Sequence, residues 1–311
     1  MRKVCLIVMF LASVAMADYR PDRDCALTTV ALKVVDEHGN PLEGAKVLFR
    51  VFTTFDKCYR LMRDTDANGD CEISGKTRGE ITVVVDKDGY YTSYGNLRYR
   101  DLPWDDAVAE RRWTRGVVSN TVVMKKVGNP ERHQYGVMRA KKPPKVNEAL
   151  AFDAAKCDWC APYGAGTVDD FYITCCVSTN TANREVYSLV LEARKCVDGF
   201  VQRETDEWSC FRYDQAADPS AEYAKTIRSG CLMDDDGAVS LIPESASKRY
   251  TIFRTRTETN ETGRIVSSHY GVILEGLKFD GELTLGVQLN PRNNDTSLED
   301  NWAFKHMKKG R

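Results

Sequence analysis

Apolar residues occupy every second position in several short segments of the first 130 residues. Residues 30–35 and 47–52 alternate in this way, and residues 81–85 and 117–127 are rich in β-branched side chains. Successive side chains of a strand point to opposite faces, so a period of two predicts strands with one buried face. Turn-forming residues separate these segments, and no helical period accompanies them. The pattern therefore predicts an antiparallel β-sandwich.

One of the predicted turns, residues 64–70, has the acidic spacing of a calcium loop. Its sequence is Asp-Thr-Asp-Ala-Asn-Gly-Asp. A calcium loop of the EF-hand type also needs flanking helices and a bidentate Glu at position twelve, where this chain has Gly75. Asp and Asn accept hydrogen bonds from their own backbone, and Gly adopts positive φ without strain. We therefore predict a turn that holds no metal ion.

Three motifs follow one another in this first part of the chain: Asp36-Glu37-His38-Gly39-Asn40-Pro41-Leu42-Glu43-Gly44-Ala45-Lys46-Val47, then Thr65-Asp66-Ala67-Asn68-Gly69, then Gly89-Tyr90. Together they resemble the carboxypeptidase regulatory-like domains, a transthyretin-like β-sandwich family. The resemblance implies that residues 18–128 form a small non-catalytic sandwich. It implies no ligand.

Strand-like segments continue in the second part of the chain, at residues 170–178, 186–193, 250–258, 267–274 and 283–289. The segment 250–258 and the residues 265–274 flank a short polar turn, which predicts a hairpin. Residues 149–311 are therefore predicted to form a second β-rich domain, again a sandwich. Residues 129–148 contain two consecutive prolines among lysines, and this composition predicts an extended linker between the domains.

The chain as a whole resembles a group of uncharacterised exported bacterial proteins. The resemblance implies domain boundaries and no activity. It rests on residues 123–130, on Asp158-Trp159-Cys160-Ala161-Pro162-Tyr163-Gly164-Ala165-Gly166 with Asp169-Asp170-Phe171, on Tyr270-Gly271-Val272-Ile273, and on residues 289–299.

The first 17 residues have the three parts of a secretory signal peptide. Met1-Arg2-Lys3 is basic, residues 4–15 are apolar, and Ala15-Met16-Ala17 is a small-x-small cleavage site. The apolar run is shorter than the ~20 residues that a membrane-spanning helix needs. We therefore expect an exported protein without a membrane span, in the periplasm, at the cell surface or outside the cell.

Charge and cysteine content narrow the choice of partners and cofactors. Lys plus Arg number 44 and Asp plus Glu 45, a balance that argues against nucleic-acid binding. Eleven cysteines occur, and ten remain when Cys5 is removed with the predicted leader. An even number of cysteines in an exported chain suggests disulfides. Cys157 and Cys160 have the spacing of a thioredoxin motif, but no helix can begin after them, so we predict a structural role and no bound zinc.

One disulfide is predicted specifically, between Cys196 and Cys210. The two residues are equally distant from Arg203, and the residues between them are polar and tolerate a turn. A hairpin closing at Arg203 would bring their Cα atoms within the range of a disulfide. Two buried free thiols are the alternative.

An aromatic and charged segment, residues 94–116, interrupts the regular pattern of the first domain. Tyr99, Trp104 and Trp113 are its candidate binding residues, because long loops often carry function. Packing of the tryptophans at the end of the sandwich or at the domain junction is the alternative. Residues 105–113 could form a short helix.

The sequence contains no motif for nucleophilic, metal-assisted or phosphate chemistry, and we predict no cofactor. The leading hypothesis is an exported, non-catalytic protein that binds a polysaccharide or protein ligand or is a structural part of the envelope. The alternative is a secreted carbohydrate hydrolase whose acid and base carboxylates lie in the C-terminal domain. Two carboxylates ~5–10 Å apart in a cleft would favour the hydrolase. A spacer without any ligand is the third possibility.

Overall fold

The structure is a computed structural model and describes residues 25–300, except 54–56, 99–105, 107–108, 129, 180–184, 207, 234–238, 243–247 and 275. The predicted leader, residues 1–17, lies outside this part. The chain divides into two compact units, one of Met1–Val127 with Glu207–Cys210, the other of Gly128–Asp206 with Phe211–Arg311. The named elements of the described residues are all strands, which confirms the all-β class. Within the described ranges, no helix is long and apolar enough to cross a membrane.

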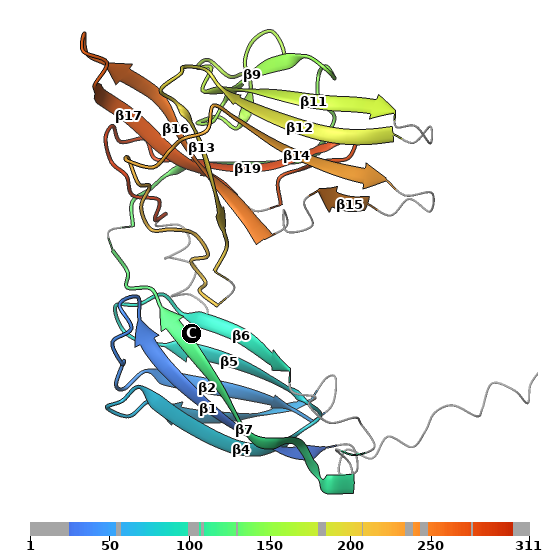
Figure 1. The fold of residues 1–311 in the computed structure, drawn as a ribbon, viewed down its shortest axis with the longest axis vertical. Helices are drawn as coiled ribbons and strands as arrows, with labels where there is room; N and C mark the ends of the chain where they lie inside the picture. The colour runs from blue at the N-terminus through green and yellow to red at the C-terminus, as the bar shows by residue number, and fades with distance from the viewer. Residues whose placement is uncertain are drawn as a thin grey trace, which may run out of the picture. The chain divides into compact units, whose positions relative to one another are not determined.

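The first unit consists of two sheets that enclose one core (Figure 1). In one sheet the order is β4-β1-β7, and in the other it is β3-β2-β5-β6. The pairing of β1 with β7 is parallel, so the sandwich is mixed rather than fully antiparallel. The strands are β1 (Ala26–Asp36), β2 (Lys46–Phe52), β3 (Cys58–Asp64), β4 (Asp70–Thr77), β5 (Glu80–Asp86), β6 (Ser93–Arg98) and β7 (Arg112–Met124).

The alternation that predicted these strands also forms their core. Val47, Phe49 and Val51 on β2 are fully buried. Phe49 lies opposite Val83 in the register with β5, so the apolar positions of the two strands coincide. Cross-strand pairs of this kind are the unit of sheet stabilisation. The inner face that β2 and β5 share is therefore apolar.

Three turns use the same Asx hydrogen bonds, including the turn with the calcium-like spacing. Asp66 Oδ1 accepts from the backbone N–H groups two and four residues later, at 2.8 and 2.9 Å. Asp36 and Asn260 make the equivalent pair of bonds. The fourth residue of the 66–70 turn is Gly69, with a φ of 76°. The acidic pattern thus stabilises a turn through the backbone.

Replacement of Asp66 tests this role. Asp66→Ala should lower the free energy of unfolding by about 1–2 kcal/mol, because two backbone N–H groups lose their acceptor. Asp66→Asn should be close to wild type, because Asn260 forms the same turn. Calcium should leave the melting temperature of all three proteins unchanged in a thermal melt. A saturable calcium-dependent rise that Asp66→Ala abolishes would contradict the assignment.

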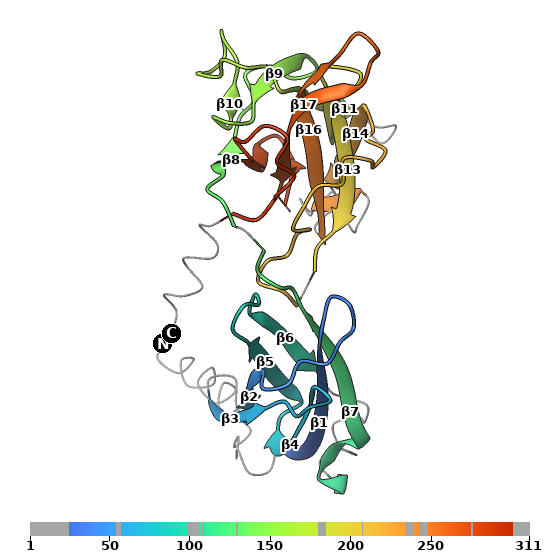
Figure 2. The same cartoon turned by 90° about the vertical axis from the view of Figure 1, so that its left-hand side faces the viewer.

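The second unit also consists of two sheets (Figure 2). One has the order β10-β9-β11-β12-β14-β15, the other the order β13-β16-β17-β19-β18, with β8 paired to β19. The predicted hairpin of residues 250–258 and 265–274 is confirmed by the pairing of β16 with β17. The strands are β8 (Gln134–Lys141), β9 (Ala149–Asp153), β10 (Asp158–Trp159), β11 (Phe171–Thr179), β12 (Glu185–Ala193), β13 (Gly199–Glu204), β14 (Thr226–Met233), β15 (Val239–Ile242), β16 (Arg249–Thr259), β17 (Ile265–Ile273), β18 (Lys278–Phe279) and β19 (Leu283–Leu289).

Aromatic rings fill the space between these two sheets. Phe171 is 1% exposed, and its ring centroid lies 5.5 Å from Phe152, 5.7 Å from Phe200 and 5.5 Å from Phe253. The second sheet is also covered on its other face, where Tyr250 belongs to a smaller apolar cluster. Burial on both faces explains the nearly continuous apolar sequence at the start of β16.

The structure differs from the predicted linker at Gln134–Lys141, which forms β8. Met138 packs in the core, whereas Tyr135 and Val137 are 50% and 39% exposed. A Cβ atom on the inward-facing Gly136 would collide with Cys157. Tyr135 and Val137 thus face solvent while Gly136 faces inward, and Met138 is the one large apolar residue of β8 on the buried face, which weakens the pattern that identifies a strand.

The predicted hairpin about Arg203 does not form, so the prediction of a disulfide between Cys196 and Cys210 across it is wrong. The polar residues that were expected to turn continue β13, which pairs with β16 from Gly199 to Glu204. Cys196 is exposed and its thiol is free. Cys210 lies in a segment of the first unit, where its N–H donates to the carbonyl of Thr92 at 3.0 Å.

Candidate functional site

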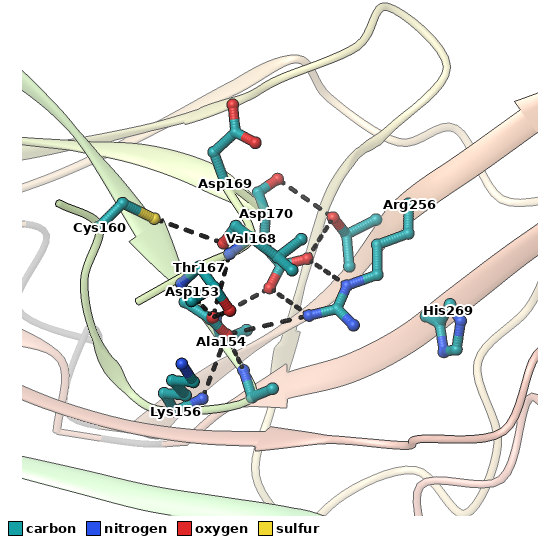
Figure 3. A network of polar contacts seen from close by, with 12 residues as sticks. Asp153, Ala154, Lys156, Cys160, Thr167, Val168, Asp169, Asp170, Arg256 and His269 are labelled. Atoms are coloured by element: carbon teal, nitrogen blue, oxygen red, sulfur yellow. Dashed lines mark hydrogen bonds and ion pairs between the residues drawn. The ribbon is translucent and has the colours of Figure 1, made fainter. Parts of the chain in front are cut away.

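Two buried carboxylates and one arginine meet in the second unit (Figure 3). Asp153 is the last residue of β9, Asp170 directly precedes β11, and Arg256 lies within β16. Both aspartates are 1% exposed, whereas 28% of the Arg256 side chain is accessible. Buried charges require partners, so this cluster is the first place to look for chemistry.

Asp170 is held by four donors. Arg256 Nε donates to its Oδ1 at 2.8 Å and Arg256 Nη2 to its Oδ2 at 3.0 Å, a bidentate pair. The backbone N–H of Ala154 donates to Oδ2 at 2.9 Å, and the hydroxyl of Thr255 to Oδ1 at 3.1 Å. Charge-assisted bidentate pairs combine strength with fixed geometry. The carboxylate is therefore fixed in one orientation.

A bulge in β16 brings Arg256 to this position. The register between β16 and β17 shifts between Thr255 and Glu258, and Arg256 has a φ of 54°. Regular alternation would place neighbouring side chains on opposite faces, but Thr255 and Arg256 both reach Asp170. A non-glycine residue in this conformation costs on the order of 1–3 kcal/mol, which the ion pair offsets.

The carboxylate of Asp153 accepts most of its hydrogen bonds from backbone N–H groups. Its Oδ2 accepts from the N–H groups of Thr167 and Val168 at 2.9 and 3.1 Å, and its Oδ1 from those of Ala155 and Lys156 at 3.0 and 3.2 Å. Burial alone would raise the pKa of this carboxyl, but these N–H groups and the charge of Arg256 hold the pKa below its usual value. Asp153 is thus held as the anion and has no proton to give to a leaving group.

The cluster also keeps Arg256 charged. The hydrogen bond to Asp170 raises the pKa of the guanidinium, against the opposing effect of burial. General acid catalysis needs a group whose pKa lies near the working pH. An anionic Asp153 and a permanently charged Arg256 do not meet this requirement. The arrangement instead ties the loop between β9 and β11 to β16.

Cys160 lies in that loop and is not an activated thiol. Its Sγ donates to the carbonyl of Val168 at 3.4 Å. Burial raises the pKa of this thiol, and the neighbouring carboxylates, first among them Asp153, raise it further. Burial likewise raises the pKa of Cys157 to about 11. Reactive cysteines have a lowered pKa, so the geometry supports the structural role predicted for both.

The motif of residues 289–299 is explained by hydrogen bonds within the unit. Asn290 is fully buried, and its Nδ2 donates to the carbonyl of Ser297 at 2.9 Å. Glu299 Oε1 accepts from the N–H of Gly128 at 3.0 Å and from Gln215 Nε2 at 2.6 Å. These side chains satisfy backbone and amide groups in three separate segments of the chain. The motif is therefore architectural.

The predicted binding residues Tyr99 and Trp104 lie outside the described residues, as do residues 105, 107 and 108 of the predicted helix 105–113, whose last two residues belong to β7. Trp113 is part of β7, is fully buried and donates its indole N–H to the carbonyl of Thr77. Its apolar ring packs beside Ala26. The prediction that Trp113 contacts a ligand is corrected accordingly, and the alternative of core packing holds.

A small recess also lies between the sheets of the second unit. Its volume is about 20 Å³, and Gln202, Ser229, Arg249 and Thr251 are among the residues that line it. That volume is on the order of one water molecule.

Comparison with known proteins finds no matching family model and no matching curated protein. Solved structures match weakly. The 3-chlorocatechol 1,2-dioxygenase of Rhodococcus opacus 1CP is 16% identical over 35% of this chain and 63% of its own, with a TM-score of 0.27. The Bacillus anthracis TIE protein is 11% identical over 84% and 31%, and a streptococcal ancillary pilin 10% over 88% and 62%, with TM-scores of 0.25 and 0.23. The chain spans less than two thirds of the dioxygenase, and these likenesses identify no activity.

Proposed function

We propose that the protein is an exported, non-catalytic β-sandwich protein that acts by binding an envelope or extracellular partner, a polysaccharide or a protein. The observation that carries this proposal is the saturation of the buried carboxylates. Asp153 accepts four backbone N–H bonds, and Asp170 is engaged by Arg256, Thr255 and a backbone N–H. Groups fixed in this way hold a scaffold together.

Two sequence features support the proposal. The basic and apolar start of the chain with its small-x-small site supports export. The three motifs shared with carboxypeptidase regulatory-like domains support an accessory module in the first part of the chain. A periplasmic, cell-surface or extracellular location follows from the leader.

The hydrolase alternative has less support. It needs one carboxyl that carries a proton at neutral pH beside another that is ionised. In the buried cluster the pKa of Asp153 is shifted in the wrong direction for the acid. Burial raises the pKa of Asp198, which lies outside this cluster, but Asp198 is 1% exposed and therefore out of reach of a substrate in solution.

The test combines binding and activity in one assay. Protein lacking residues 1–17 is incubated with isolated cell envelope and with purified wall polysaccharides, and both retention and newly formed reducing ends are measured. We expect saturable retention without new reducing ends, and heat-unfolded protein is the control for adsorption. Enzymatic release of reducing ends would contradict the proposal, and so would the absence of saturable retention on every envelope fraction.

Export is tested separately. The full chain should appear outside the cytoplasm in shortened form after cell fractionation, and a chain that lacks residues 1–17 should remain inside. Retention of the full chain in the cytoplasm would contradict the assigned location.

A further inference from the structure

The second unit contains a buried histidine next to residues 291–300, the last segment that the structure describes. His133 is 6% exposed and immediately precedes β8. Its Nδ1 lies 2.6 Å from Nε2 of Gln288, which is 5% exposed. The same Gln288 Nε2 donates to the carbonyl of Leu298 at 2.7 Å. One side-chain amide therefore joins His133 to the segment 291–300.

This chain of contacts fixes the protonation state of the imidazole. The carbonyl of Leu298 can only accept, so the Gln288 amide must present its nitrogen on this side. That nitrogen has a second N–H, and His133 Nδ1 accepts it. The ring is therefore neutral and carries its proton on Nε2, an atom that is buried and has no hydrogen-bond partner among the described residues.

A proton on Nδ1 is incompatible with this arrangement. Two donors would then face each other at His133 and Gln288. Rotation of the Gln288 amide would offer its oxygen to the imidazolium, but would turn the same oxygen toward the carbonyl of Leu298. Without rotation the two donors repel each other across 2.6 Å, and with rotation the Gln288–Leu298 hydrogen bond is lost, which leaves a buried carbonyl without a donor.

We propose that His133 is a proton-operated switch: protonation of its Nδ1 breaks the Gln288–Leu298 hydrogen bond and loosens the segment 291–300. Leu298 is fully buried in the smaller apolar cluster, so this segment covers part of the second sheet. The switch depends only on the second unit and is independent of the binding function proposed above.

The surrounding charges set the direction of the pH dependence. Burial lowers the pKa of His133, while Asp300, Asp295, Glu131 and Glu299 oppose this shift. Arg292 Nη1 is bound to Glu131 at 2.9 Å. Because the folded-state pKa is lowered, the neutral ring stabilises the fold above the ordinary histidine pKa. That stabilisation is lost as the pH falls through the folded-state value.

The protonation state is tested without any change at the site. The protein lacking residues 1–17 is labelled with nitrogen-15 at its four histidines, and each ring is assigned with variants that lack one of the other three. Nitrogen shifts at neutral pH should show the Nε2–H form for His133. The Nδ1–H form, or a charged ring at neutral pH, would overturn the proposal.

The loosening is tested by hydrogen exchange of residues 291–300 at pH 7.5 and pH 5, corrected for the intrinsic effect of pH on exchange. Acid should speed corrected exchange in wild type roughly tenfold, which corresponds to about 1.4 kcal/mol. His133→Asn should abolish the effect, because the asparagine Oδ1 accepts in place of Nδ1 and does not titrate. His269→Asn is the matched control, since His269 Nδ1 lies 3.2 Å from the carbonyl of Asn290 beside the same segment, and it should keep the acid effect. Equal exchange at both pH values in wild type, or an acid effect that survives in His133→Asn, would overturn the proposal.

Discussion

Asp170→Ala is expected to lower the free energy of unfolding by about 3–5 kcal/mol, because it leaves a partly buried guanidinium without its bidentate partner and with only Asp153, 3.9 Å away, as a carboxylate neighbour. The substitution also removes the acceptor of the Ala154 N–H and of the Thr255 hydroxyl. Denaturant unfolding followed by fluorescence measures the change.

Asp169→Ala is the matched control for this experiment. Asp169 is the neighbouring residue and forms an ion pair with Arg194 at 2.5 Å, with 30% of its side chain and 48% of that of Arg194 accessible. Exposed ion pairs contribute about 0–1 kcal/mol, so this variant should be close to wild type. Equal losses in the two variants would show that the bidentate pair with Arg256 is not the source of the effect.

Phe171→Ala should be similarly destabilising, by about 3–5 kcal/mol, because it opens a cavity between the sheets of the second unit. Three phenylalanine rings contact Phe171 at centroid distances of 5.5–5.7 Å, and they come from strands of both sheets. The measurement is again denaturant unfolding. Phe171→Leu keeps most of the volume and should lose about 1.5 kcal/mol or less.

Tyr172→Ala provides a control on the same strand. Tyr172 is half-buried and points to the opposite face of β11, so its removal opens no space between the sheets. The loss should be clearly smaller than for Phe171→Ala. A loss as large in Tyr172→Ala would place the main core of the unit on the other side of this sheet.

Most of the strands could be predicted from alternation, but strands with few deeply buried apolar residues could not. β3 has intermediate or exposed positions throughout, and its charged residues hide its pairing with β2. β8 has glycine facing inward and Tyr135 and Val137 facing outward, so its sequence gives no strand signal. In both cases the partner strand supplies the stabilisation, and a partner cannot be identified from the segment itself.

The candidate site could not be predicted from the sequence for a similar reason. Strict alternation along β16 puts Arg254 and Arg256 on one face of the sheet. In the structure Arg254 lies over the ring of Tyr223, 4.2 Å from its centroid, whereas the bulge directs Arg256 to Asp170. A glycine at the bulge would have been a visible signal, but an arginine occupies the positive φ. Asp170 stood out in the sequence only as part of a motif, without any sign of its partner.

The segment Glu207–Cys210 completes the first unit, although it is synthesised after the rest of that unit. It belongs to the first unit, where the Tyr94 N–H donates to the carbonyl of Trp208 at 2.6 Å. The indole covers Gly95 so closely that a Cβ atom there would lie 2.6 Å from it. Synthesis proceeds from the N-terminus, so the strands of the first unit emerge well before Trp208 does. During this interval the edge of β6 lacks its last partner and is open to pairing with another chain. The newly made protein therefore needs protection from aggregation until residue 210 has emerged.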